Sequence, residues 1–217
     1  QGHSARLARS ARAMALKLPT TPRRLRDLVC ATFRAGARRD CMVRVYVSRG
    51  PGGFSVDPYE PPESALYIVV SAGGQPFMTD HPRGARVFSS AVPAKIPALA
   101  RVKNCNYIPN VFMRKEAVDR KIDFTVGFDA AGRMTEGATE NFGIVTGDRR
   151  LLFPHLGHVL KGTTMMRVMA LARCLVRKGV LRSVGFADID RHAIAAAREF
   201  LVTGTTVNVA AAVEFDG

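Results

Sequence analysis

Two short segments of the chain combine residue types suited to holding a small anion. Leu160-Lys161-Gly162-Thr163-Thr164 opens a helical pattern, and Thr203-Gly204-Thr205-Thr206 forms a turn before a strand-like run. Glycine lets the backbone approach a ligand closely, and the N–H groups of a first helical turn bind anions. The order Lys-Gly differs from the Gly-Lys-Thr of a P-loop, which disfavours nucleotide binding. An ordinary helix start and a plain turn stay open as alternatives.

Two further segments carry groups that could react with or polarise a bound organic molecule. In Thr135-Glu136-Gly137-Ala138-Thr139-Glu140-Asn141, Glu136 could pair with a protonated ring nitrogen, although a solvated hairpin has the same composition. In Arg101-Val102-Lys103-Asn104-Cys105-Asn106-Tyr107, the lysine lies among small and apolar residues and could form a Schiff base. A surface role is the plain alternative for Lys103.

Other residue patterns exclude several functions. His155 and His158 lie three residues apart in a loop with no third ligand nearby, so no metal site is predicted. The chain has no Gly-x-Ser-x-Gly elbow, which disfavours a serine hydrolase.

The elements that position these segments predict two α+β domains, residues 1–74 and 75–217, joined at Gly73-Gly74-Gln75-Pro76. The first domain is predicted to contain helices over 3–17 and 22–35, and strands over 41–48 and 66–71. In the second we expect a helix over 107–120, with Val111, Phe112 and Ala117 facing inward. The other predicted elements are hairpins over 124–135 and 142–153, helices over 163–178 and from Asp190 to about Leu201, and strands over 207–209 and 212–215.

The overall charge is strongly basic, with 32 basic and 18 acidic residues among 217 and a net charge of +14. Many arginines between Arg6 and Arg39 follow helical spacings without an RNA-binding signature, which indicates a solvated helical face. We therefore expect no nucleic-acid partner. No apolar run approaches the roughly 20 residues of a membrane span, so no membrane partner is expected.

The cysteine spacings and the N-terminal pattern indicate a cellular compartment. The two ends of the sequence indicate whether flanking segments are expected. Cys30, Cys41, Cys105 and Cys174 match no zinc or redox spacing, and the sequence opens in a helical pattern rather than a signal peptide. Free thiols in the cytoplasm are therefore expected. The chain starts inside a helix and stops at a turn, so segments are expected to precede and follow it.

Taken in order, the four segments resemble the class IV aminotransferases, which are pyridoxal-phosphate (PLP) enzymes of fold type IV. The resemblance runs from His3-Ser4-Ala5-Arg6-Leu7 to Phe215-Asp216-Gly217. It implies a two-domain α+β fold, here lacking N- and C-terminal segments, and a homodimer.

The resemblance also implies a role for each site residue. Lys103 is similar to the Schiff-base lysine that moves a proton during catalysis, and Glu136 to the partner of the pyridine nitrogen. The other implied cofactor contacts are Arg6, Tyr107, Thr139, Asn141, Gly162, Thr163, Thr164 and Thr205. Arg44 and Thr206 are the implied substrate contacts, and the resemblance implies no metal.

The implied reaction transfers an amino group from a branched-chain or other apolar L-amino acid to a 2-oxo acid. Phe54-Ser55-Val56 stands where D-amino acid transaminases carry Arg-x-His, which disfavours that branch. The Ser48–Gly53 loop and the step from Lys103 to Asn106 also resemble aminodeoxychorismate lyases, which form 4-aminobenzoate and pyruvate. A non-catalytic basic binding protein is a further alternative, supported by the charge alone.

Overall fold

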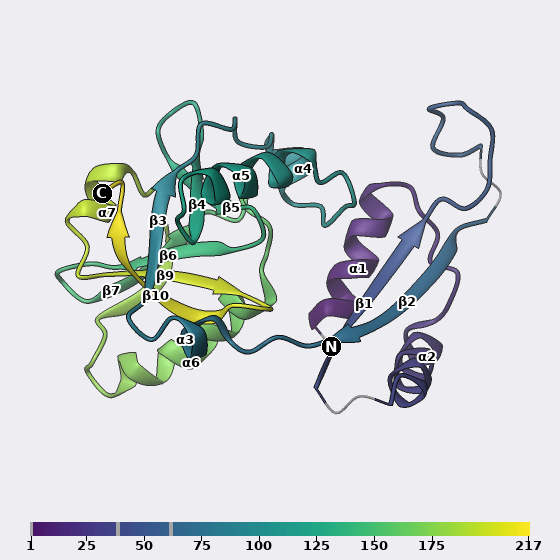
Figure 1. Ribbon diagram of the computed structural model, residues 1–217, viewed down its shortest axis with the longest axis horizontal. Helices are drawn as coiled ribbons and strands as arrows, with labels where there is room; N and C mark the ends of the chain where they lie inside the picture. The colour runs from purple at the N-terminus through teal and green to yellow at the C-terminus, as the bar shows by residue number, and fades with distance from the viewer. Residues whose placement is uncertain (1, 38–39, 61–62) are drawn as a thin grey trace. The chain divides into compact units, whose positions relative to one another are not determined.

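The computed structural model describes residues 2–37, 40–60 and 63–217. Arg38 and Arg39, part of the basic N-terminal segment, lie outside the described residues. The chain divides into two compact units, residues 1–74 and 75–217 (Figure 1). Each unit is described separately below.

The helices of the described residues are α1 (Gly2–Ala13), α2 (Pro22–Ala35), α3 (Phe77–Asp80), α4 (Pro97–Ala100), α5 (Ile108–Asp119), α6 (Thr163–Arg177) and α7 (Arg191–Ala195). The strands are β1 (Cys41–Ser48), β2 (Ala65–Ala72), β3 (Ala85–Ser89), β4 (Phe124–Phe128), β5 (Met134–Gly137), β6 (Asn141–Val145), β7 (Arg150–Pro154), β8 (Ser183–Ala187), β9 (Glu199–Gly204) and β10 (Asn208–Phe215). No helix among the described residues is long and apolar enough to cross a membrane.

The first unit is an antiparallel hairpin of β1 and β2 accompanied by two helices. Helix α2 begins where the sequence predicts, because Pro22 occupies the first turn and the Thr21 hydroxyl accepts a hydrogen bond from Arg24 N at 3.2 Å. It packs against β2. The bounds predicted for α2 and for β1 are confirmed.

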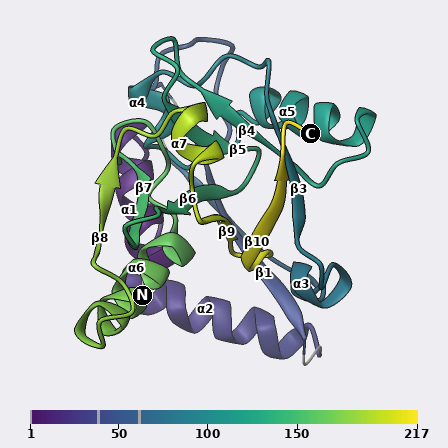
Figure 2. The ribbon, with the colours of Figure 1, turned by 90° about the vertical axis from the view of Figure 1, so that its left-hand side faces the viewer.

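The second unit is built on a sheet in the order β5-β4-β3-β10-β9-β6-β7-β8. An additional pairing of β5 with β6 closes the first six strands of that order into a barrel, and β7 and β8 extend it. Strands β3 and β10 run parallel and lie side by side (Figure 2). The β5–β6 pairing closes the barrel, and it joins Glu136 to Asn141, two residues of the motif noted in the sequence.

Two apolar clusters hold this unit together. The barrel strands contribute residues such as Val87, Val126 and Phe142, each no more than 2% exposed. Helix α6 buries Met165, Met169 and Ala172 against residues of β6 and β7, among them Val145, Leu151 and Phe153. This spacing places one face of α6 on the sheet and sets the position of its first residue, Thr163.

Two expectations about this unit are wrong. The helix predicted from Asp190 to Leu201 ends at Ala195, and Glu199–Gly204 forms β9, because Phe200 and Val202 pair with β6 in the barrel. On α5 the residues that face inward include Asn110, Met113 and Ala117, whereas Val111 and Phe112 are 60% and 53% exposed. Apolar character alone did not indicate which face of α5 is buried.

Candidate functional site

The site forms where the barrel closes. Strands β5 and β6 share one register pair, Glu136 with Asn141, and a tight turn connects them through Gly137 N to Glu140 O at 2.9 Å. Because opposed residues of a sheet lie within about 5.5 Å, this pairing fixes the two side chains as neighbours. The sequence motif from Thr135 to Asn141 is therefore a β-turn-β unit at the barrel junction.

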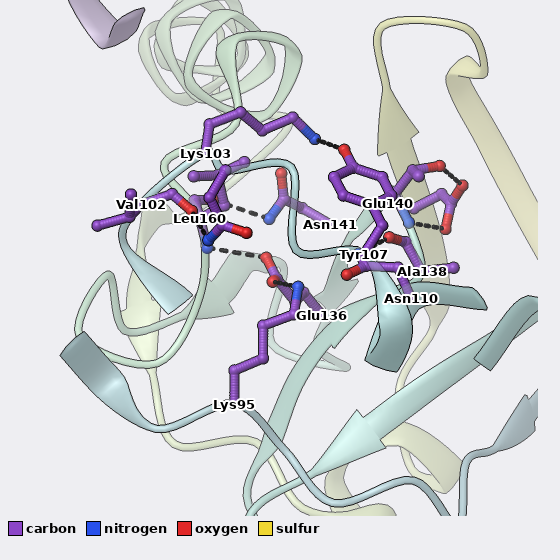
Figure 3. A network of polar contacts seen from close by, with 12 residues as sticks. Lys95, Val102, Lys103, Tyr107, Asn110, Glu136, Ala138, Glu140, Asn141 and Leu160 are labelled. Atoms are coloured by element: carbon purple, nitrogen blue, oxygen red, sulfur yellow. Dashed lines mark hydrogen bonds and ion pairs between the residues drawn. The ribbon is translucent and has the colours of Figure 1, made fainter. Parts of the chain in front are cut away.

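A cleft with roughly 400 Å³ of space between its walls, partly open to solvent, lies over this junction. Figure 3 shows the polar network that lines it. The lining residues are Lys95, Ala100, Val102, Lys103, Asn104, Tyr107, Asn110, Glu136, Gly137, Ala138, Thr139, Glu140, Asn141 and Leu160. Of the predicted site residues, the cleft brings together Lys103, Tyr107, Glu136, Thr139 and Asn141.

The Glu136 carboxylate is held through both of its oxygens. Lys95 Nζ donates to Oε1 at 3.1 Å, and Leu160 N donates to Oε2 at 2.8 Å. The two side chains are largely buried, with Lys95 22% and Glu136 13% exposed. Both contacts were missed from the sequence, because Lys95 lies in an aperiodic segment and the second donor is a backbone N–H group.

Lys103 lies in the loop between α4 and α5, on the rim of the cleft. Its ammonium donates a hydrogen bond to Tyr107 Oη and lies 5.0 Å from the centre of that ring (Figure 3). Asn104 braces the loop, since its side chain donates to Val102 O at 3.1 Å and accepts from Asn106 N at 2.9 Å. The exposed Lys103 side chain is thus carried on a fixed turn and can reach a molecule in the cleft.

Asn141 connects the cleft to the start of α6. Its side chain donates to Leu160 O at 3.0 Å. A Cβ atom built on Gly162 would lie 1.9 Å from Asn141 Oδ1, so the glycine is required for this close approach. Helix α6 then begins at Thr163, with Gly162 as its N-cap, no side-chain capping hydrogen bond and no acidic residue in its first turn. Such a helix start, which also carries Thr164, offers N–H groups to an anion.

The turn between β5 and β6 is fixed from inside. Glu140 is 8% exposed and accepts hydrogen bonds from the backbone N–H group, at 2.9 Å, and the hydroxyl of Thr139. Asn110, 7% exposed, donates to Ala138 O. The spacing of Asn110 with Met113 and Ala117 on α5 is a sequence signal that could have identified this buried amide.

Thr205 and Thr206 lie in the turn between β9 and β10 and are exposed. They do not line the cleft, but they follow Thr203, whose hydroxyl donates to Asn141 O at 3.2 Å. A Cβ built on Gly204 would lie 3.9 Å from Thr139 O, so this turn borders the rim. The two threonines are therefore neighbours of the cleft rather than part of its wall.

Arg6 and Arg44 belong to the first unit. Arg6, on α1, donates to His3 Nδ1 at 3.4 Å. Burial and the nearby guanidinium lower the pKa of His3 below its ordinary value. Arg44 is exposed on β1 opposite Val69. Their proposed contacts with a cofactor and a substrate stay predictions.

The two loop histidines pair with acidic residues. His158 Nδ1 lies 3.7 Å from Asp129, and His155 Nε2 lies 4.0 Å from Asp188. Within residues 2–37, 40–60 and 63–217, no group of three or more His, Cys, Asp or Glu side chains could hold a metal ion.

Comparison with known proteins places this geometry in a family. The profile of the family described as Amino-transferase class IV matches residues 1–215. The chloroplastic D-amino-acid transaminase of Arabidopsis thaliana is 29% identical over 215 residues, which cover 99% of this chain and 57% of that protein. The chain thus spans a little over half the length of this relative.

Solved structures show the same fold. The branched-chain aminotransferase of the thermophilic archaeon Thermoproteus uzoniensis, solved with norvaline, has a TM-score of 0.87 at 24% identity, over 100% of this chain and 71% of that chain. A protein from Legionella pneumophila, provisionally named 4-amino-4-deoxychorismate lyase, has a TM-score of 0.87 at 17% identity, over 100% and 77% of the two chains. The predicted α+β fold of fold type IV is confirmed, and with a family profile that matches nearly its whole length, the chain belongs to the class IV aminotransferase family.

Proposed function

We propose that the chain carries the catalytic part of a PLP-dependent aminotransferase, with Lys103 as the residue that binds the cofactor covalently. The observation that carries the proposal is the convergence of Lys103, Tyr107, Glu136 and Asn141 on one cleft beside the start of α6. Family membership supports the reaction class.

The polar groups in and beside the cleft match the polar groups of PLP. Its aldehyde requires a primary amine, its ring nitrogen an anionic partner, and its phosphate N–H groups and cations. The cleft offers Lys103 for the first and Glu136 for the second, and the start of α6 lies next to Asn141 for the third. When bound, PLP would supply a ring that withdraws electrons from the substrate Cα.

The residues of this chain would do the remaining work. Lys103 Nζ would act as the base that accepts the proton of the substrate Cα and as the acid that returns it to the bound molecule. Glu136 would hold a proton at the ring nitrogen, and Tyr107 would orient the Lys103 amine through its hydroxyl. Gly162, Thr163, Thr164, Thr205 and Arg6 are proposed to anchor the phosphate, with Thr139 and Asn141 supporting the ring.

Absorption spectroscopy tests this proposal. Wild-type protein mixed with PLP should develop a visible band that borohydride abolishes, and peptide mapping should then find the reduced cofactor on Lys103. Lys103→Ala should show no band, whereas Lys115→Ala, at a lysine 65% exposed on α5, should match the wild type. No band in the wild type, or cofactor attached at Lys95, would contradict the assignment. Colourless protein whose nucleic-acid affinity falls with salt would instead support the basic binding module.

For the substrate we propose a branched-chain or other apolar L-amino acid, with Arg44 and Thr206 binding its carboxylate. The absence of Arg-x-His at 54–56 supports this choice. Because a relative is named a D-amino-acid transaminase, the assay must include both enantiomers of valine and leucine with 2-oxoglutarate. Release of pyruvate and 4-aminobenzoate from aminodeoxychorismate would favour the lyase instead.

We further propose that a second copy of the chain covers the exposed face of α5. Ile108, Val111 and Phe112 form an apolar stripe there, 65%, 60% and 53% exposed, which begins directly after Tyr107. Light scattering should find a dimer in the wild type and a monomer in Phe112→Glu. Leu171→Glu, at an equally exposed position on α6, should stay dimeric. A monomeric wild type would refute the dimer.

A further inference from the structure

The ion pair between Lys95 and Glu136 places a second ammonium group in the cleft beside the residue proposed to hold the ring nitrogen. Lys95 approaches Oε1 at 3.1 Å, and Leu160 N occupies the other oxygen at 2.8 Å. Lys103, Tyr107 and Glu140 are the other ionisable side chains of the cleft wall. Each oxygen of Glu136 therefore already accepts one hydrogen bond from the protein, and a ligand donor would share the carboxylate with Lys95.

The segment that carries Lys95 is anchored to the barrel and to α5. Ser90 N donates to Val126 O at 2.8 Å, and both Ser90 Oγ and Ala91 N donate to the Glu116 carboxylate. Lys95 and Glu136 also line a second, smaller cavity, together with residues such as Val92 and Met113. Both members of the pair therefore belong to the walls of both spaces, and the anchored segment fixes where the ammonium lies.

We propose that Lys95 weakens the hold of Glu136 on the proton of the cofactor ring nitrogen, and so sets how far the ring is protonated; this rests on the proposed PLP function. A donor bonded to either oxygen of this carboxylate lies within roughly 8 Å of the Lys95 ammonium, given ordinary hydrogen-bond lengths. Two positive charges at such a distance repel one another noticeably in a partly buried site. The Lys95 charge therefore opposes a protonated ring, and its removal favours one.

Lys95 could act through its positive charge or only by orienting the Glu136 carboxylate, and these two roles predict different results for substitutions of Lys95. Lys95→Gln keeps a donor for Glu136 but removes the charge, and Lys95→Arg keeps both. If the charge sets the ring equilibrium, the glutamine variant changes it and the arginine variant does not. If Lys95 acts only by orienting the carboxylate, Lys95→Gln behaves as the wild type.

The test is the ¹⁵N chemical shift of ring-labelled PLP bound to each variant, followed across pH. We expect the midpoint of ring protonation to rise by about one pH unit in Lys95→Gln, a roughly tenfold change in that equilibrium. It should stay at the wild-type value in Lys95→Arg and in the surface control Lys115→Met. Lys95→Met serves as a second charge-removing variant if the glutamine variant does not fold.

Several outcomes overturn the inference. A wild-type midpoint in both charge-removing variants, or an equal rise in Lys95→Arg, would exclude charge tuning while leaving PLP binding intact. Wild-type protein that binds no PLP is a different result, because it refutes the proposed function itself.

Discussion

Gly162→Ala tests whether the close approach of Asn141 to the start of α6 builds the phosphate end of the site. The backbone of Gly162, at φ −64° and ψ 134°, suits alanine, so the substitution introduces no conformational strain. The added Cβ would lie 1.9 Å from Asn141 Oδ1 and 3.0 Å from its Cγ. Asn141 must therefore turn away or α6 must shift.

The cost follows from what Asn141 loses. Its hydrogen bond to Leu160 O, 3.0 Å long and formed by a residue 7% exposed, would break. Leaving a buried partner unsatisfied costs about 1–3 kcal/mol. We expect that decrease in the free energy of unfolding. If the same displacement spoils the phosphate contacts, a loss of about 2 kcal/mol would weaken PLP binding roughly thirtyfold.

Urea denaturation of the apo protein and PLP titration measure the two effects. Gly157→Ala is the matched control, because it adds the same methyl group in the same loop with no atom within 4 Å. In an Asn141→Ala background the clash is absent, so Gly162→Ala should cost almost nothing there. Equal destabilisation in both backgrounds, or no difference from Gly157→Ala, would refute the reasoning.

Three further predictions concern the packing and the acid stability of the second unit and the environment of Lys103. Phe142→Ala, at a fully buried barrel position, should lower the free energy of unfolding by about 3–5 kcal/mol. A loss as small as that of Phe112→Ala, at an exposed position of α5, would contradict the assignment of Phe142 to the core. Burial raises the pKa of Asp129, but hydrogen bonds from Arg133 and from Ala131 N outweigh it and hold the pKa below its ordinary value. Its stabilising contribution is therefore present above about pH 4 and lost as the pH falls through the lowered pKa, so acid titrations should show a smaller loss of stability in Asp129→Asn; identical acid profiles would exclude this. Tyr107→Phe removes the hydroxyl that accepts from Lys103 and should shift the visible band of bound PLP, and an unchanged spectrum would place the tyrosine outside the cofactor environment.

Local signals allowed parts of the fold to be predicted from the sequence, and long-range pairing limited the rest. Helix α2 was placed correctly because Thr21 and Pro22 mark its start within a few residues. Residues 199–201 were assigned to the end of a helix because their strand character depends on pairing with β6, over 50 positions away. Strands β3 and β8 were not predicted for a similar reason, since each runs parallel to a strand distant in the sequence.

The candidate site shows the same division. The predicted site residues that converge on the cleft come from two motifs, 101–107 and 135–141, because each motif needs only a short turn to place its own side chains. Lys95 could not be found in this way, since its meaning depends on a carboxylate 41 residues later. The exposure of Val111 and Phe112 was missed because apolar character alone does not indicate which face of a helix is buried.

The closure of the barrel at Glu136 and Asn141 links the integrity of the sheet to occupancy of the site. Strand β6 pairs with β9 along its whole length, from Asn141 to Val145, but meets β5 at a single pair. Such a junction is expected to be the first to open in local fluctuations of the native state. Any ligand that keeps Glu136 beside Asn141 would stabilise the closed sheet through its own binding free energy. Amide exchange at Gly137 would then report ligand affinity directly, even before any turnover takes place.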